Sequence, residues 1–102
     1  MTSVKKARDQ EVTLRIINLR DSQTQLVIEP WGEAYPFAPD DHFVVIARGP
    51  APATPEIAYE QDAVVVWGWV GSSVRLFKNG TELGTGDFQR TPVPDAFPKL
   101  TI

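Results

Sequence analysis

The chain has 102 residues, no cysteine, a formal net charge of −3 and 42 % hydrophobic residues. This length fits one domain that can bury a core without a metal ion or a disulfide. The missing cysteines exclude thiol catalysis, thiolate metal sites, iron–sulfur clusters and disulfide scaffolds. The composition argues against a disordered or membrane-spanning chain, and the negative charge argues against a general nucleic-acid binder.

Three parts are predicted along the chain. Residues 1–10 form a basic, solvated leader; because charge appears within its first five positions and no long apolar run follows, we expect a cytoplasmic protein. Residues 11–87 form the folded domain. Residues 88–102 contain three prolines and should run extended, docking Phe97, Leu100 and Ile102 on this domain or on a neighbour.

The domain is predicted to be all-β, because polar and apolar residues alternate between turns and no helical spacing is sustained. Strands are expected over residues 11–18, 24–29, 42–48 and 56–60, followed by strands within 63–86. About seven short strands with frequent turns predict an antiparallel two-sheet sandwich with Greek-key connections, immunoglobulin-like or cupredoxin-like in outline. A blue-copper site is excluded, since it needs two histidines and a cysteine and the chain has one histidine.

Two turns predict how residues 63–86 pair. Asn79-Gly80 is a strong signal for a type I′ hairpin that places Leu76 opposite Leu83. A tight turn at Gly71-Ser72 would make a second hairpin from 63–78, whereas a three-residue loop there would exchange the two faces. The tight turn places one apolar set on one face: Val65, Trp67, Trp69, Val74, Leu76 and Leu83. The reverse face then carries Val64, Val66 and Phe77, which we predict as an interface for self-association.

The segment EPWGEAYPFAPDDH, residues 29–42, is the most distinctive candidate site and reads as a loop. It contains aromatic residues, carboxylates and the single histidine; the predicted binding residues are Trp31, Glu33, Tyr35, Phe37 and His42. The EPWGE-x-Y pattern, followed by a valine-rich strand, VWGW and an NG-E-L hairpin, resembles a group of small uncharacterised bacterial all-β proteins. That resemblance implies a fold class and a bacterial origin, and no activity.

Several roles stay open for this segment. Its acids Glu29, Glu33, Asp40 and Asp41, with His42, could form a carboxylate-based enzyme site if they converge in a pocket. No calcium-loop spacing is present, and we predict neither a metal nor another cofactor. The plainer interpretation is that Trp31 and Tyr35 fill one end of the sandwich while the acids face water.

Trp67 and Trp69 carry another open choice, since residues two apart on a strand share a face. Exposed, they and Trp31 could stack sugar rings; buried, they fill a core. The sequence therefore predicts a non-catalytic binding or assembly module, self-associating or bound to a protein partner, with no nucleic-acid or membrane partner. A carbohydrate-binding module and a small carboxylate enzyme are the alternatives. The small-molecule ligand, if there is one, is not specified.

Overall fold

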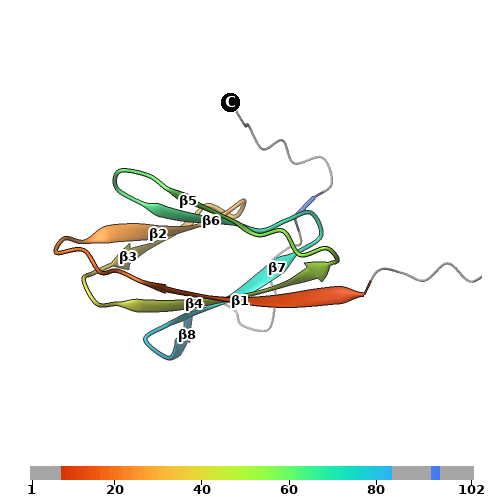
Figure 1. Ribbon diagram of the computed structural model, residues 1–102, viewed down its shortest axis with the longest axis horizontal. Helices are drawn as coiled ribbons and strands as arrows, with labels where there is room; N and C mark the ends of the chain where they lie inside the picture. Colours follow the sequence, from red (N-terminus) through yellow and green to blue (C-terminus); the bar gives the residue numbers. More distant parts are fainter. Residues whose placement is uncertain (1–7, 84–92, 95–102) are drawn as a thin grey trace, which may run out of the picture.

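Eight strands form two packed sheets in the computed structural model, which describes residues 8–83 and 93–94 (Figure 1). Sheet A has the strand order β1-β4-β7-β8, and sheet B has the order β3-β2-β6-β5. The strands are β1 (Asp9–Ile17), β2 (Thr24–Glu29), β3 (Glu33–Phe37), β4 (His42–Pro50), β5 (Glu56–Tyr59), β6 (Val64–Trp67), β7 (Ser73–Lys78) and β8 (Thr81–Leu83). The predicted all-β, two-sheet sandwich is confirmed. No helix able to cross a membrane occurs in the described part of the chain.

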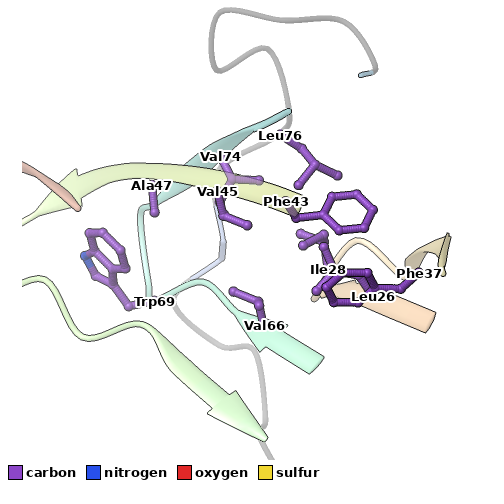
Figure 2. Packing of buried hydrophobic residues seen from close by; sticks show 10 residues of the cluster. All are labelled: Leu26, Ile28, Phe37, Phe43, Val45, Ala47, Val66, Trp69, Val74 and Leu76. Atoms are coloured by element: carbon purple, nitrogen blue, oxygen red, sulfur yellow. The ribbon is translucent and has the colours of Figure 1, made fainter. Parts of the chain in front are cut away.

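Alternation of side chains builds the core between the sheets. In sheet A one inward row runs across all four strands, from Leu14 through Val45 and Leu76 to Leu83. Sheet B contributes its own inward residues, and Figure 2 shows the two sets meeting; the buried cluster is Leu26, Ile28, Phe37, Phe43, Val45, Ala47, Val66, Trp69, Val74 and Leu76. Burying such side chains supplies most of the driving force for folding, about 1.5–3 kcal/mol for each large one.

The predicted Asn79-Gly80 hairpin is confirmed. Both residues have positive φ, 48° and 88°, as a type I′ turn requires. The pairing of Leu76 with Leu83 and of Phe77 with Glu82 follows from that two-residue loop. The register of β7 and β8 is therefore encoded locally.

The predicted hairpin over residues 63–78 is wrong. Strand β6 lies in sheet B, where it pairs parallel with β2 and antiparallel with β5, whereas β7 lies in sheet A beside β4. The β2–β6 pair is also an exception to the expected antiparallel pairing. Val64 and Val66 consequently point toward the core, and Val65 and Trp67 occupy the other face of β6.

The chain crosses from sheet B to sheet A through residues 68–72 instead of folding back. A Cβ on Gly68 would lie 2.6 Å from Ser72 Oγ, so the crossing has no room for a side chain there. The Ser72 hydroxyl accepts a hydrogen bond from the Trp69 backbone N–H at 2.8 Å. Ser72 is fully buried, and its carbonyl accepts a bond from the Val93 N–H at 3.0 Å. This close approach of Gly68 to Ser72 closes one end of the sandwich.

Strand β3 lies inside the segment predicted as a loop. Its prolines suggested a loop, but β3 is an edge strand of sheet B, where Pro36 needs no ladder hydrogen bond on its free side. Tyr35 and Phe37 alternate inward, opposite Leu26 and Thr24 of β2. The chain therefore has eight strands among its described residues rather than about seven.

The predicted boundaries shift slightly. β1 begins at Asp9, inside the expected leader, and residues 1–7 lie outside the described part of the chain. Most of the predicted tail, with Phe97, Leu100 and Ile102, also lies outside it. Val93 and Pro94 are the described exceptions; Val93 is 5 % exposed, and its carbonyl accepts a hydrogen bond from the Gly71 N–H.

The buried residue Asn18 links the connection between β1 and β2 to the connection between β3 and β4. Asn18 is 4 % exposed, and its amide nitrogen donates to the carbonyls of Phe37 at 2.9 Å and Ser22 at 3.0 Å. Its side-chain oxygen accepts from the Arg20 N–H at 2.9 Å. Its backbone also exchanges hydrogen bonds with Asp40 and Asp41. One side chain therefore satisfies groups that two loops would otherwise leave unpaired.

Asn18→Ala should lower the free energy of unfolding by about 2–4 kcal/mol, because the Phe37 carbonyl is left buried and unpaired. Urea unfolding followed by tryptophan fluorescence measures this. Gln23→Ala, an amide-to-methyl change at an exposed position of the same connection, should change it by less than about 0.5 kcal/mol. Equal effects of both variants would contradict a joining role for Asn18.

Candidate functional site

The predicted binding residues do not form one site. Trp31 is half-buried against the core near Gly68, whereas His42 is exposed at the start of β4. Between them runs β3, whose five residues span roughly 16 Å. The structure brings together only three of the five residues, Glu33, Tyr35 and Phe37, on the inward face of β3.

Those three residues have structural contacts. The Tyr35 hydroxyl donates to Glu33 Oε1 at 2.7 Å. The Phe37 ring is fully buried and meets Phe43 edge-on, with 4.9 Å between ring centroids. The Tyr35 ring lies tilted against Phe43 at 6.2 Å. The interpretation that Trp31 and Tyr35 pack into the sandwich is therefore confirmed, and Phe37, predicted as a binding residue, is buried there as well.

The four acids of the segment do not converge. Glu29 ends β2 and Glu33 begins β3, whereas Asp40 and Asp41 lie beyond the other end of β3. Asp41 is used within the β3–β4 loop: its Oδ2 accepts from the Ala38 N–H at 2.9 Å. Within residues 8–83 and 93–94, no three side chains of the metal-ligating types gather into a site. The convergence required by the carboxylate-enzyme alternative is absent from this segment.

Asp41 also joins the loop to the β7–β8 turn. Asn79 Nδ2 donates to Asp41 Oδ1 at 3.1 Å, and Lys78 Nζ lies 3.4 Å from Oδ2. The hydrogen bond from Asn79, then the bond from the Ala38 backbone, lower the pKa of the Asp41 carboxyl below its usual value, with Lys78 adding to the effect against desolvation. The folded protein therefore favours the charged carboxylate.

The predicted interface of Val64, Val66 and Phe77 is wrong as a shared surface. Val66 is 2 % exposed in the core and Val64 packs against it, because β6 turns that face inward. Phe77 lies on the outward face of the other sheet. Arg75 covers its ring at 5.1 Å from the centroid and pairs with Glu82 at 2.8 Å. The three residues thus belong to two different faces.

Trp67 and Trp69 do not form a flat stacking platform either. Trp69 is 8 % exposed, and its indole Nε1 donates to the Pro50 carbonyl at 2.7 Å. Trp67 lies on the outward face of β6, flanked by Glu29 and Glu56. Both contribute to the lining of a hollow of about 370 Å³ beside Pro52 and Val70. The pair of indoles assumed for sugar stacking is therefore broken up.

One long side of the sandwich is closed. Lys78 reaches from β7 across to β3, where its Nζ donates to the Pro36 carbonyl at 2.9 Å. The same ammonium lies 5.6 Å from the centroid of the Phe43 ring, so it covers the core with its charge on the rim. Together with Asp41 and Asn79, Lys78 joins the sheets along this side.

The other long side is open. A groove of about 450 Å³ lies between the edge strands β1 and β5. Its described lining comes from β1, the turn after it and the β5–β6 hairpin, with one residue each from β2 and β3; the residues are Arg15, Ile16, Ile17, Asn18, Leu19, Arg20, Thr24, Phe37, Ile57, Tyr59, Glu60, Ala63 and Val64. Arg20 reaches across one end, with Nη1 3.4 Å from the Gln61 carbonyl oxygen. The lining is mainly apolar, with charged side chains at the rim.

Thr24 lines this groove and carries a buried hydroxyl that is unpaired among the described residues. It is the first residue of β2, faces inward, and is 7 % exposed. Its Oγ1 is the buried side-chain polar atom for which the described chain offers no hydrogen-bond partner. A buried hydroxyl without a partner costs about 1–3 kcal/mol, so a ligand group that reached this atom would recover part of that cost.

Sequence reasoning did not find this groove. The alternation of TQLVIE predicts that Thr24 faces inward. A threonine at the start of a strand is common, however, and does not by itself indicate a binding site. The groove exists because β1 and β5, far apart in the chain, are the edges of different sheets on the same side. Because the predicted hairpin paired β6 with β7 in one sheet, the sequence did not predict that β1 and β5 lie on the same side.

Comparison with known proteins identifies no relative. No protein-family model matches the chain, and neither a curated protein nor a solved structure matches it.

Asp41 makes stability dependent on acid pH. Because its folded pKa is lowered, its contribution is present above the ordinary value of 3.8 and is lost as the pH falls through the folded value. The free energy of unfolding should therefore fall less between neutral pH and about pH 2.5 in Asp41→Asn than in the natural protein, because asparagine does not titrate. Urea unfolding at both pH values measures it.

A second variant removes the Asn79 amide, which both donates to Asp41 and accepts from the His42 N–H. Asn79→Gly keeps the positive φ of the turn and removes the amide donor, so the pKa of Asp41 should move back toward 3.8. The free energy of unfolding of Asn79→Gly should therefore fall less on acidification than that of the natural protein. An unchanged loss in Asp41→Asn would show that other groups carry the acid sensitivity.

Proposed function

We propose that this protein is a non-catalytic binding module whose groove between β1 and β5 takes a small amphipathic molecule. The observation that carries the proposal is the buried Thr24 hydroxyl, which lacks a protein partner inside an otherwise apolar hollow. The proposed ligand has an apolar body and one group that hydrogen-bonds with Thr24 Oγ1.

The size and lining of the groove support this class of ligand. Its volume of about 450 Å³ lies within the range of small-molecule sites, roughly 300–1,000 Å³. Ile16, Ile57 and Val64 offer apolar contact, and Phe37 is fully buried beside them. Such sites typically combine apolar walls with few polar groups that fix the ligand's orientation. The groove contains that combination, whereas residues 29–42 do not form a pocket with converging acids.

The remaining predictions from the sequence are untested. A protein partner, a cytoplasmic location and a bacterial origin stay predictions, as does the resemblance to small bacterial proteins with the EPWGE-x-Y pattern. A carbohydrate-binding module is less well supported, because Trp69 is buried and its indole N–H is already bonded within the protein. A carboxylate enzyme is less well supported because its acids lie at opposite ends of β3.

Thr24→Val tests the unpaired hydroxyl. Valine keeps the branched shape and removes the polar group, so without ligand the free energy of unfolding should rise by up to about 1 kcal/mol. Urea unfolding measures this. Thr81→Val, the same change at an exposed position of β8, is the matched control and should leave the free energy within about 0.5 kcal/mol. A clear loss of stability in Thr24→Val would mean that a buried partner already satisfies the hydroxyl.

Octanol is a suitable probe of the groove, since it combines an apolar chain with one hydroxyl. We expect its titration to shift the methyl NMR signals of Ile16 and Ile57 in a saturable way. Thr24→Val should weaken octanol binding about fivefold, the value of one neutral hydrogen bond, while Thr81→Val should not. Shifts spread over the whole protein, or equal affinity in both variants, would contradict the proposed site.

A further inference from the structure

Strand β1 is an unusually open edge. The two sheets have four edge strands, and three of them limit pairing with another chain: β5 has four residues, β8 has three, and β3 contains Pro36. Shortness and proline are common protections of a sheet edge. β1 has nine residues, DQEVTLRII, without proline or glycine, and among the described residues it pairs with β4 alone. Within residues 8–83 and 93–94, no strand pairs with the backbone donors and acceptors on its other side.

The charges of β1 are complementary to those of a second, antiparallel β1. The middle residue of the strand is Thr13, and Glu11 and Arg15 lie two positions to either side of it. If two copies align with Thr13 opposite Thr13, each Glu11 lies opposite Arg15 of the other copy on the outward face. On the inward face, each Val12 lies opposite Leu14 of the other copy. Opposite charges and apolar pairs at such cross-strand positions stabilise a sheet.

The side chains of the described chain leave these charges available. Arg15 is exposed, and no carboxylate of the described chain lies within ion-pair distance of it. Glu11 is bonded to Arg48 through one oxygen only: both contacts, from Nε at 3.2 Å and Nη2 at 2.9 Å, reach Oε2. Oε1 remains able to accept from a second guanidinium. Glu11 could therefore lie between Arg48 of its own chain and Arg15 of a second copy.

We infer that the protein forms a symmetric dimer in which β1 pairs antiparallel with β1 of a second copy, centred on Thr13. The two copies of sheet A then join into one sheet of eight strands. The pairing is self-complementary, as a two-fold dimer requires, and it includes the whole of β1. This interface differs from the one predicted with Val64, Val66 and Phe77, and it does not depend on a ligand in the groove.

A charge exchange tests this register. Analytical ultracentrifugation from low micromolar to millimolar protein should show a monomer–dimer equilibrium that weakens with added salt. Arg15→Glu places like charges opposite each other twice and should raise the dimer dissociation constant at least about tenfold. The double variant E11K/R15E restores opposite charges and should recover the dissociation constant to within about threefold.

The controls separate this interface from others and from misfolding. Arg15→Glu breaks no ion pair within the described chain, so its urea unfolding should match that of the natural protein. Asp9→Lys should leave the dimer unchanged, because Asp9 lies opposite Ile17 in this register. Thr24→Val should also dimerise normally, which separates this inference from the groove proposal. A monomer at every concentration, a dimer insensitive to Arg15→Glu, or a dimer disrupted by Asp9→Lys would overturn the inference.

Discussion

The close approach of the chain at Gly68 and Ser72 determines most of this structure. Ser72 lies against two glycines: a Cβ on Gly49 would be 2.6 Å from its Cα, and one on Gly68 would be 2.6 Å from its Oγ. Because the backbone can pass there, β6 and β7 enter different sheets rather than one hairpin. That separation turns Val64 and Val66 inward and Trp67 outward, and so decides which residues line the groove and which form the core.

Local patterns predicted much of the fold. Alternation over residues 24–29 gave the bounds of β2, and Asn79-Gly80 gave the register of β7 with β8, because both signals depend on neighbours in sequence. The sheet to which a strand belongs depends instead on contacts between distant segments. At β6 both faces are apolar, so alternation could not say which face is inside. At β3 the prolines concealed an edge strand that tolerates them.

The candidate site was harder to predict than the fold for the same reason. Its walls come from edges of two different sheets, and its distinguishing feature is a missing hydrogen bond at Thr24 rather than a residue type. The conspicuous residues of EPWGEAYPFAPDDH are mostly accounted for by packing: Trp31, Tyr35 and Phe37 contact the core, and Asp41 joins two turns. Unusual composition in this segment therefore indicated structural constraint.

One long side of the sandwich is closed by contacts between the sheets and the other is open, and this difference connects the groove with the dimer. On the side of β3 and β7, Lys78 joins the sheets and a proline protects the edge. On the side of β1 and β5, no such link closes the described groove apart from Arg20 at one end. A second copy paired along β1 would place its Gln10 opposite Ile16, at the mouth of the groove. The second copy would then cover the free edge of β1 and add a polar side chain beside the apolar wall of the groove. The same contact would therefore protect the sheet edge and contribute to the groove.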